Sequence, residues 1–287
     1  MPLPAHLDVP ATFGRFSRNG DDVLERWDGE VLARCARVGG RVVPFAARVR
    51  DGALEVSAAR KDRLAAEAAV QVMVEAHPPG WADLLAVDAS LRRIAAMYPG
   101  LHAVRTLDPV VALVHAISAQ QVNLRWAATT RRRLAETYGH PVTVGATELR
   151  VLDLELLAQA RVEDLRTLQL TTAKARALIG LAAAVVDGTL DLDTLSRADD
   201  HTVQATLVAL RGIGPWTAQW YLVRVLGRPV VVAGDLAVRK AVGRLYGTTS
   251  APSPTETLAL TDHWRGCALT AQQLVLHALS EGTLDVR

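Results

Sequence analysis

The sequence predicts an α+β protein in which a small N-terminal antiparallel β-sheet domain precedes an all-α bundle. Two observations support this prediction. In the first 60 residues, short segments of alternating or β-branched apolar residues are separated by glycine-containing turns, which is typical of hairpin strands. From Asp83 onward the chain consists of segments with helix-capping signals. We therefore expect a sheet domain over residues 1–80 and a helical domain over residues 81–287.

The sheet domain is predicted to be a meander of three or more strands. Residues 30–38 alternate apolar and polar side chains, and Gly39-Gly40 offers a two-residue turn into residues 41–49. Asp51-Gly52 gives a second turn signal before "ALEVSA". A helix is expected over residues 60–76, and "HPPGW" at 77–81 breaks the pattern at the domain boundary.

The helices of the second domain are predicted from their capping residues. The expected N-caps are Asp108, Asn123 and Thr171 or Thr172, and the last two helices end at Gly139 and Gly188. Further helices are expected over residues 199–210, 215–227, 235–246, 255–263 and 268–281.

The composition excludes several classes of protein. No segment approaches the ~20 consecutive apolar residues of a membrane span, and the N-terminus lacks the pattern of a signal peptide. Two distant cysteines, Cys35 and Cys267, cannot form a disulfide framework or hold an iron–sulfur cluster. We therefore expect a cytoplasmic protein with no membrane association and no iron–sulfur centre.

Basic residues are concentrated in one region, although the formal net charge of the chain is only +2. Residues 204–247 contain six basic residues and a single acid, Asp235. A local basic field of this kind indicates a polyanionic partner, although an ordinary solvated surface would have the same composition.

The stretch "LRGIGPWTAQW" at 210–220 places a Gly-Ile-Gly turn directly before a helix. Gly212 and Gly214 permit positive φ angles and close approach of another molecule, and Pro215 suits the first helical position. The amides of this turn can bind a phosphate at the helix start. A tight helix–helix connection would use the same residues, so both interpretations are open at this point.

Asp235 opens a later helix, after a short apolar and β-branched segment. It is either a simple N-cap or a functional carboxylate, and its position as the single acid of a basic region favours the second interpretation. Arg239 lies four residues further along the same helix face, where it is either a partner of Asp235 or a phosphate contact.

These features together resemble the helix–hairpin–helix DNA glycosylase superfamily. The pattern L-x-G-I-G-x-x-T-A, followed by an extended stretch and an aspartate at a helix start, matches residues 210–247. The block "DPVVALVHAISAQQVNLRWAA" at 108–128 is similar to a second motif of the family. With its N-terminal sheet, the chain is most similar to the DNA-3-methyladenine glycosylase II branch. The resemblance implies a monomeric base excision repair enzyme that acts on damaged double-stranded DNA in the nucleoid.

The resemblance implies roles for individual residues. Asp235 corresponds to the catalytic aspartate. The residues expected to contact DNA are Gly212, Gly214 and Thr217 of the hairpin, Gln121 as the side chain that fills the gap in the duplex, Gln120 beside it, and Arg239. The main-chain carbonyls that correspond to a monovalent cation site (Na⁺ or K⁺) in relatives belong to Val208, Leu210 and Ile213. No other cofactor is expected.

The expected mechanism is base flipping followed by hydrolysis of the N-glycosidic bond, with Asp235 stabilising the positive charge that develops on the sugar. Relatives that also nick the strand use a lysine two residues after the second hairpin glycine, and Trp216 occupies that position here. The chain has only three lysines, Lys61, Lys174 and Lys240. We therefore expect a monofunctional glycosylase without lyase activity.

Trp216 and Trp220 share one helix face and are either core aromatics or walls of the base pocket, as in the 3-methyladenine branch. Phe16 of the sheet domain is a third candidate for the core or the pocket. Aromatic walls favour cationic guests such as N-alkylated purines. The last helix offers only His277 and aliphatic side chains where relatives carry further aromatics. The alternatives to a glycosylase for alkylated bases are a glycosylase for oxidised or deaminated bases and a non-catalytic DNA-binding module.

Overall fold

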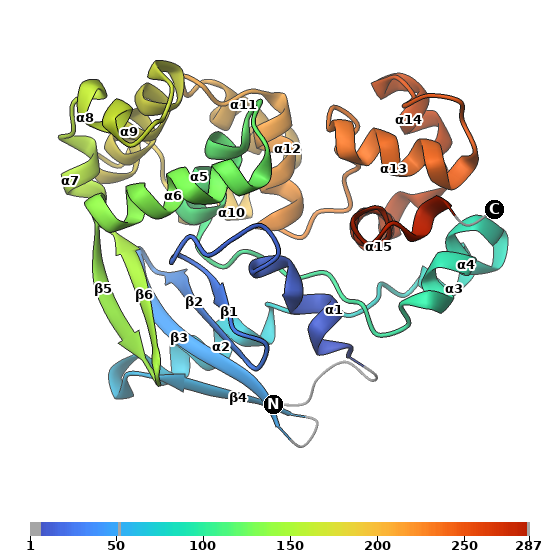
Figure 1. Ribbon diagram of the computed structural model, residues 1–287, viewed down its shortest axis with the longest axis horizontal. Coiled ribbons are helices and arrows are strands. Elements are labelled where there is room, and N and C mark those ends of the chain that lie inside the picture. The colour runs from blue at the N-terminus through green and yellow to red at the C-terminus, as the bar shows by residue number, and fades with distance from the viewer. Residues whose placement is uncertain (1–6, 51–52, 286–287) are drawn as a thin grey trace.

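The computed structural model describes residues 7–50 and 53–285, and its first part is a four-stranded antiparallel sheet in the order β1-β2-β3-β4 (Figure 1). The strands are β1 (Arg26–Trp27), β2 (Val31–Val38), β3 (Arg41–Arg50) and β4 (Ala53–Ala58). The predicted meander is therefore confirmed, while the Asp51-Gly52 turn lies outside the described residues. One face of the sheet packs on α2 (Arg63–Gln71), which is shorter than the helix expected over residues 60–76.

The α+β fold class is confirmed, but the prediction that only helices follow Asp83 is wrong at one place. Strands β5 (Gly139–Val144) and β6 (Thr147–Leu152) form a hairpin against the second face of the N-terminal sheet. Its inward residues Val144, Leu149 and Val151 pack with Ala33 and Cys35 of β2. The alternation of apolar residues on both sides of the turn at 145–146 is the sequence signal for this hairpin.

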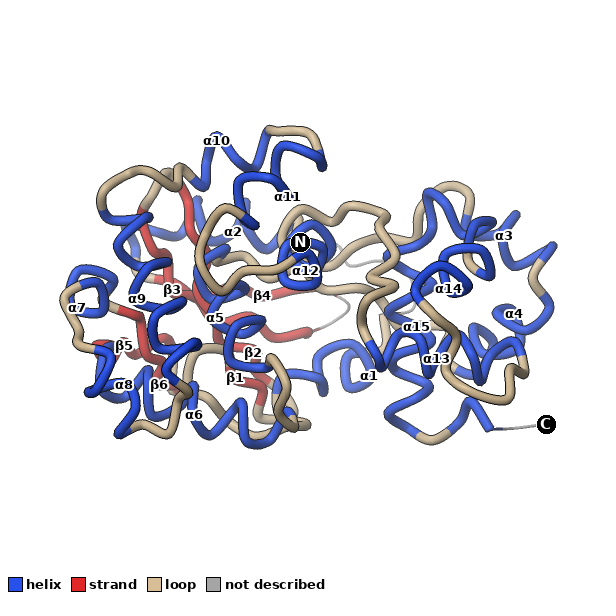
Figure 2. The backbone as a smooth tube through the Cα atoms, turned by 90° about the horizontal axis from the view of Figure 1, so that it is seen from above, coloured by secondary structure: helices blue, strands red, loops and turns tan. Residues whose placement is uncertain are grey.

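The helices form two lobes with separate hydrophobic cores (Figures 1 and 2). The first lobe contains α5 (Pro109–Ala119), α6 (Leu124–Tyr138), α7 (Leu154–Ala158), α8 (Val162–Thr167), α9 (Thr172–Val186), α10 (Leu192–Arg197), α11 (Asp200–Val208) and α12 (Pro215–Arg224). The second contains α3 (Trp81–Val87), α4 (Ala89–Met97), α13 (Leu236–Tyr246), α14 (Pro254–Leu260) and α15 (Ala268–Glu281). The chain enters the second lobe twice, before and after it builds the first.

The predicted caps explain where the central helices begin. The side chains of Asp108, Asn123 and Thr171 accept hydrogen bonds from the amides of Val110, Trp126 and Lys174, at 2.9, 2.8 and 3.3 Å. Each bond satisfies one of the amides that a helix start leaves without an intrahelical partner. None of the helices within residues 7–50 and 53–285 combines the length and apolar character of a membrane span.

A short N-terminal segment joins the sheet to the second lobe. Helix α1 (Val9–Phe13) continues into a 3₁₀ turn over Gly14–Phe16 and lies between the sheet and α15 in Figure 1. The amide of Asp8 donates to the carbonyl of Gly100 at 2.8 Å. This segment carries Arg15 and Phe16, and Arg15 lies close enough to Arg224 at the end of α12 for its charge to lower the pKa of that residue.

Candidate active site

Asp235 lies where the chain crosses from the first helical lobe to the second, and its two carboxylate oxygens have different partners. Oδ1 caps α13 by accepting hydrogen bonds from the amides of Ala237 and Val238, at 2.7 and 3.1 Å. Oδ2 accepts hydrogen bonds from two indoles, Trp216 Nε1 at 2.8 Å and Trp220 Nε1 at 3.1 Å. Asp235 is thus an N-cap, and its second oxygen is oriented by two additional donors that capping does not require.

The hydrogen bonds of Asp235 hold its carboxylate in a fixed position. The carboxylate is only partly buried, at the positive end of the α13 dipole, and all four of its hydrogen bonds come from N–H donors. Such a fixed carboxylate can stabilise positive charge on a group that is brought next to it, without reorganisation at the moment of reaction.

Helix α12 supplies both indoles and connects them to the Gly-Ile-Gly turn at its start. Trp216 and Trp220 are partly buried, and Trp220 also packs against the core of the second lobe. Because their N–H edges are held by Asp235, the orientation of both rings is determined by the carboxylate. Trp220 is thus in part a core residue, and both rings border the carboxylate, while their role as walls of a base pocket stays a prediction.

The glycines of the turn have different structural roles. Gly212 has φ +85°, and a Cβ there would lie 2.5 Å from the Cβ of Ala177 in α9. Gly214 has φ −101°, so it does not use the positive φ that a glycine permits. No atom of the described residues lies within 4 Å of a Cβ built on Gly214. Gly212 is needed for packing against α9, while Gly214 leaves open space in front of the α12 start.

The start of α12 has no side-chain cap. Gly214 occupies the N-cap position without a side-chain hydrogen bond, and Pro215 is the first helical residue. The first amides of α12 therefore lie at the positive end of the helix dipole without a capping side chain at the N-cap position. Val208, Leu210 and Ile213 precede them at the C-terminal end of α11, and the Leu210 carbonyl accepts from the Ile213 amide at 3.1 Å.

The turn between α5 and α6 is joined to the Gly-Ile-Gly turn by Gln120. Its Nε2 donates to the carbonyl of Gly212 at 3.0 Å and to Oγ1 of Thr217 at 3.2 Å. Thr217 is only 1% exposed, so its hydroxyl holds the turn and does not face solvent. Gln121 is exposed and has φ +54°, a strained conformation for a residue other than glycine. Gln120 thus joins the motif at 108–128 to the motif at 210–247, and the exposed Gln121 lies next to this junction.

Arg239 does not complete the site in the way that its spacing suggested. Its Nε donates to the carbonyl of Pro252 at 2.6 Å, in the segment between α13 and α14. The partners of Asp235 are the indoles and amides described above. Arg211 directly before the Gly-Ile-Gly turn and Lys240 on α13 are exposed basic residues.

Arginine residues that sequence reasoning missed surround the aromatic rings. Arg224 lies over the ring of Trp220 at 4.8 Å, and its Nη1 donates to Oε1 of Gln273 in α15 at 2.7 Å. Arg34 and Arg15 lie over the ring of Phe16, at 4.6 and 5.1 Å. The spacing of Trp220 and Arg224, four residues apart on one helix, was the available signal.

These guanidinium groups are held in a region that penalises positive charge. Burial, followed by the charge of Arg15, lowers the pKa of Arg224, and the negative charges of Asp235 and Glu25 oppose this shift. Burial also lowers the pKa of Arg15 to about 10, with Glu25 opposing and Arg34 adding to the shift. The mutual influence of these groups shows that they share one poorly solvated region beside Asp235.

His277 does not belong to this region. It is buried and contacts the ring of Tyr98 edge-on, with centroids 4.6 Å apart. Two side chains of α15 reach the surroundings of Asp235: Gln273 accepts from Arg224, and Oε1 of Gln272 accepts from the amide of Val232 in the crossing segment at 2.8 Å. His277 is therefore a core residue, and its side chain does not line the region around Asp235.

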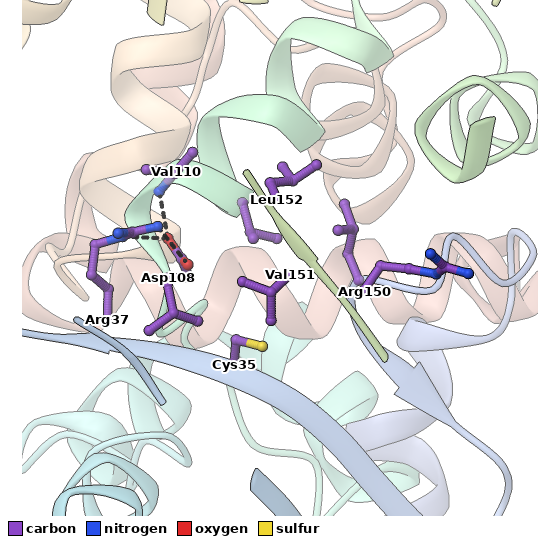
Figure 3. Close-up of a pocket in the computed structure, with 10 residues that line it drawn as sticks. Cys35, Arg37, Asp108, Val110, Arg150, Val151 and Leu152 are labelled. Atoms are coloured by element: carbon purple, nitrogen blue, oxygen red, sulfur yellow. Dashed lines mark hydrogen bonds and ion pairs between the residues drawn. The ribbon is translucent and has the colours of Figure 1, made fainter. Parts of the chain in front are cut away.

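An enclosed cavity exists elsewhere, between the sheet, β6 and the start of α5 (Figure 3). Its volume of about 10 Å³ suits at most one water molecule. It is lined by Cys35 and by the ion pair between Arg37 and Asp108. Burial raises the pKa of the Cys35 thiol to about 12, so this thiol is unreactive. Among the described residues no cluster of three or more His, Cys, Asp or Glu side chains could hold a metal ion.

Comparison with known proteins identifies relatives of the chain. Residues 114–265 match the HhH-GPD superfamily of base excision DNA repair proteins. The chain is 34% identical over 198 residues to a probable bifunctional transcriptional activator/DNA repair enzyme AlkA of Mycobacterium tuberculosis, which covers 67% of this chain and 38% of that protein. It is 25% identical over 185 residues to the DNA-3-methyladenine glycosylase of Bacillus subtilis, which covers 64% and 61%. The chain thus spans less than two thirds of the length of either relative.

Solved structures share the fold. A 3-methyladenine DNA glycosylase from Archaeoglobus fulgidus superposes with a TM-score of 0.84 over 98% of both chains, at 20% sequence identity. An 8-oxoguanine glycosylase/lyase of Clostridium acetobutylicum, in complex with double-stranded DNA, superposes with a TM-score of 0.73 over 96% of this chain and 93% of that one, at 15% identity.

Proposed function

The chain belongs to the HhH-GPD superfamily of base excision DNA repair proteins, and on this basis we propose that it is a monofunctional DNA glycosylase. Its substrates would be alkylated bases of the 3-methyladenine type, removed from double-stranded DNA. The observation that supports this most strongly is the Asp235 carboxylate, whose Oδ2 is held by two indoles of the helix that begins at the Gly-Ile-Gly turn.

One short helix relates the proposed phosphate contact to the proposed chemistry. Helix α12 has 10 residues and is therefore about 15 Å long. Its uncapped start, with open space at Gly214, would bind a DNA phosphate through main-chain amides. Its side presents Trp216 and Trp220 to Asp235. A duplex bound at the start of α12 is thus held at a set distance from the carboxylate.

The chemistry proposed for Asp235 is electrostatic. A target base inside a duplex is inaccessible, so the nucleotide must be flipped out, and Gln121 would fill the gap that remains. Cleavage of the glycosidic bond builds positive charge on the sugar, which the fixed Oδ2 of Asp235 would stabilise while it orients the attacking water. Gln120 and Thr217 would support the turn from inside, and Arg239 and Arg211 would add charge near the backbone of the DNA.

The lysine inventory supports the absence of a lyase step. Lys174 is buried and its Nζ donates to the carbonyl of Ser118 at 2.8 Å, which holds the end of α5. Lys240 follows Asp235 by five residues, about 140° around the helix axis, and Lys61 belongs to the sheet domain. Trp216 occupies the position at which strand-nicking relatives have the lysine that forms a Schiff base.

A cation at the hairpin fits the chain. The carbonyls of Val208, Leu210 and Ile213 are neutral oxygen donors at the negative end of the α11 dipole, which suits a hard monovalent cation. Such an ion would supply positive charge beside the DNA phosphate. We further propose that the enzyme acts as a monomer on the cytoplasmic nucleoid.

The alternatives make different predictions about Asp235. A non-catalytic DNA-binding module has no use for the two indole hydrogen bonds to Oδ2, since capping of α13 needs only Oδ1. A glycosylase for oxidised or deaminated bases would keep the same carboxylate and differ in the lining of its pocket. The surroundings of Trp220 and Phe16 therefore bear on the substrate class.

The test is base release from duplexes that each contain one lesion. The panel contains 7-methylguanine, a stable 3-methyladenine analogue, 1,N6-ethenoadenine, hypoxanthine and 8-oxoguanine, and strand breaks are scored before and after alkali. We expect release of alkylated bases, with breaks only after alkali. Intact duplex binding without release of any lesion would identify a binding module, and breaks before alkali would contradict a monofunctional enzyme.

A further inference from the structure

Lys174, in the first turn of α9, is a buried cation that the proposed chemistry does not use. It is only 8% exposed, and its Nζ donates a hydrogen bond to the carbonyl of Ser118 at 2.8 Å. Within residues 7–50 and 53–285 no carboxylate pairs with it, and burial lowers the pKa of its ammonium group. Burying an ammonium group without a counter-ion is costly, so an apolar side chain would fill this position at lower cost.

The carbonyl that Lys174 binds belongs to the last turn of α5, three residues before Gln121. Carbonyls in the last turn of a helix have no amide partner within the helix, and the negative end of the helix dipole attracts a cation. Arg131 of α6 donates to Oγ of the same Ser118 at 3.0 Å, but its charge is paired with Asp22 at 2.7 Å. Lys174 therefore supplies the α5 end with a positive charge that is not shared with an ion-pair partner.

The start of α9 also contacts the Gly-Ile-Gly turn. A Cβ built on Gly212 would lie 2.5 Å from the Cβ of Ala177 and 3.9 Å from the carbonyl oxygen of Ala173. Gln120 links the two turns directly, through its hydrogen bonds to the Gly212 carbonyl and to Oγ1 of Thr217. The first two turns of α9 thus fix the α5–α6 turn and the proposed phosphate-binding turn relative to each other.

Gln121 has a backbone conformation that depends on this support. A residue other than glycine keeps a φ of +54° only where its surroundings hold it there. The Gln121 side chain is exposed, so the neighbouring residues of the turn have to hold it. On one side Lys174 binds Ser118 and the Gly-Ile-Gly turn binds Gln120, and on the other side Asn123 caps α6.

We propose that Lys174 is a positioning residue for base flipping, because its ammonium group holds the end of α5 so that Gln121 projects into the gap left by the flipped base. This inference rests on the proposed glycosylase function and adds a residue that acts through Gln121, away from the reacting atoms. Filling the gap offsets the pairing and stacking that the flipped base loses. Loss of Lys174 should therefore slow base release most where the damaged base is paired.

The experiment compares single-turnover rates of 7-methylguanine release from two duplexes. In one the lesion is paired with cytosine, and in the other it lies opposite an abasic-site analogue, so that no base pair has to be broken. Lys174→Met removes the ammonium group at nearly constant volume, and Lys174→Arg keeps a charged donor. We expect Lys174→Met to lower the ratio of the paired to the unpaired rate by about tenfold to a hundredfold, and Lys174→Arg to retain most of it.

The matched control is Leu178→Ala, which creates a cavity four residues further along the same helix. Leu178 is 0% exposed in the core of the first lobe, so this variant destabilises α9 without touching the end of α5. The ratio of the two rates should stay as in the wild type. A merely structural role of Lys174 would give the same result in Lys174→Met and in Leu178→Ala.

A double-mutant cycle with Gln121→Gly tests whether Lys174 acts through Gln121. Glycine adopts a φ of +54° without strain and has no side chain to position. In this background Lys174→Met should therefore lower the ratio no further. A reduction as large as in the wild-type background would show that the effect of Lys174 does not pass through Gln121, and would overturn the inference.

Lys174→Gln serves the same purpose if Lys174→Met does not fold, because its amide is one bond shorter and stops short of the Ser118 carbonyl. An unchanged ratio in the folded variant would overturn the inference while the proposed function stands. No base release by the wild type from either duplex would instead remove the proposed function, and the inference with it.

Discussion

Asp235 combines a structural role in capping α13 with the chemical role that we propose for its second carboxylate oxygen. Its Oδ1 takes part in capping α13, and its Oδ2 is the acceptor for two indole N–H groups. Capping is encoded locally, so a sequence that places an aspartate at a helix start already predicts it. Trp216 and Trp220 lie 19 and 15 positions before Asp235, so no local pattern predicts their hydrogen bonds to it. The spacing of the two tryptophans on α12 predicts only that their rings share one helix face.

Residue-scale reasoning failed where partners are distant in the chain. Arg224 and Gln273 are 49 positions apart, and only the packing of α15 against the crossing segment brings them together. No local pattern marks Gln273 as a partner of an arginine.

At the residue scale, His277 should make stability depend on pH. Burial, followed by the charge of Arg18, lowers the pKa of His277 below its ordinary value of about 6.5. Below that value the unfolded chain binds a proton that the folded protein resists, so the free energy of unfolding falls as the pH drops from 7.5 to 5.5. His277→Gln should reduce this fall, measured by urea unfolding at both pH values.

The matched control for this prediction is His201→Gln, because His201 is exposed on α11. It should leave the pH dependence as in the wild type. An equal pH dependence in His277→Gln and the wild type would show that His277 does not contribute.

At the scale of elements, substitutions of the two glycines in the Gly-Ile-Gly turn should differ in their effects on stability and on DNA binding. Gly212→Ala places a Cβ 2.5 Å from the Cβ of Ala177 at φ +85°, so it should cost about 1–3 kcal/mol in the free energy of unfolding. Gly214→Ala adds a Cβ in open space at φ −101° and should leave stability within about 0.5 kcal/mol. It should nevertheless weaken DNA binding, because the Cβ would stand where we propose that the DNA phosphate approaches.

Urea unfolding and duplex affinity, each measured for both variants, check this separation. The duplex should contain a stable abasic-site analogue, and its affinity should be measured at two salt concentrations because phosphate contacts are salt-dependent. Wild-type affinity in Gly214→Ala would show that the start of α12 is not the phosphate site.

Most elements followed from local signals, and the exceptions have physical reasons. The helices α5, α6, α9 and α13 begin at the predicted caps, since a cap is made within one turn of chain. The β5–β6 hairpin was missed although its apolar residues alternate, because Gly139 was interpreted only as a helix end. It is also the first residue of β5, and a Cβ there would lie 2.6 Å from the carbonyl oxygen of Ala135.

At the scale of the whole molecule, the division of the helices into two lobes could not be predicted from the sequence. Both lobes have ordinary amphipathic helices, and the pairing of α4 with α15 depends on contacts between segments far apart in the chain. The result is that Asp235 lies on the crossing between the lobes, at the start of α13 and in contact with two indoles of α12.

The buried ion pair between Arg34 of β2 and Glu25, which precedes β1, should stabilise the sheet and its contact with the segment that leads into α5. Arg34 Nε donates to Glu25 Oε1 at 2.7 Å and its Nη1 donates to the carbonyl of Arg105 at 2.8 Å, and the two side chains are 0% and 5% exposed. Arg34→Met leaves a buried carboxylate without its guanidinium and should cost about 3–5 kcal/mol in the free energy of unfolding.

Two further variants make this prediction specific. The double variant Arg34→Met/Glu25→Gln should be less destabilised than Arg34→Met alone, because no buried charge is left without a partner. Arg48→Met, which removes an exposed pair with Glu55 on the same sheet, should change stability by no more than about 1 kcal/mol. Equal stability of the wild type and Arg34→Met would contradict a structural role for the pair.

The central claim is that Asp235 performs the chemistry, and the most direct measurement is the single-turnover rate of base release by Asp235→Asn. Asparagine is a good N-cap, so Oδ1 can still cap α13, whereas its Nδ2 would face two indole donors without a negative charge. We predict a rate at least about a hundredfold below that of the wild type, with the affinity for an abasic-analogue duplex unchanged. Equal rates in the two proteins would contradict the account.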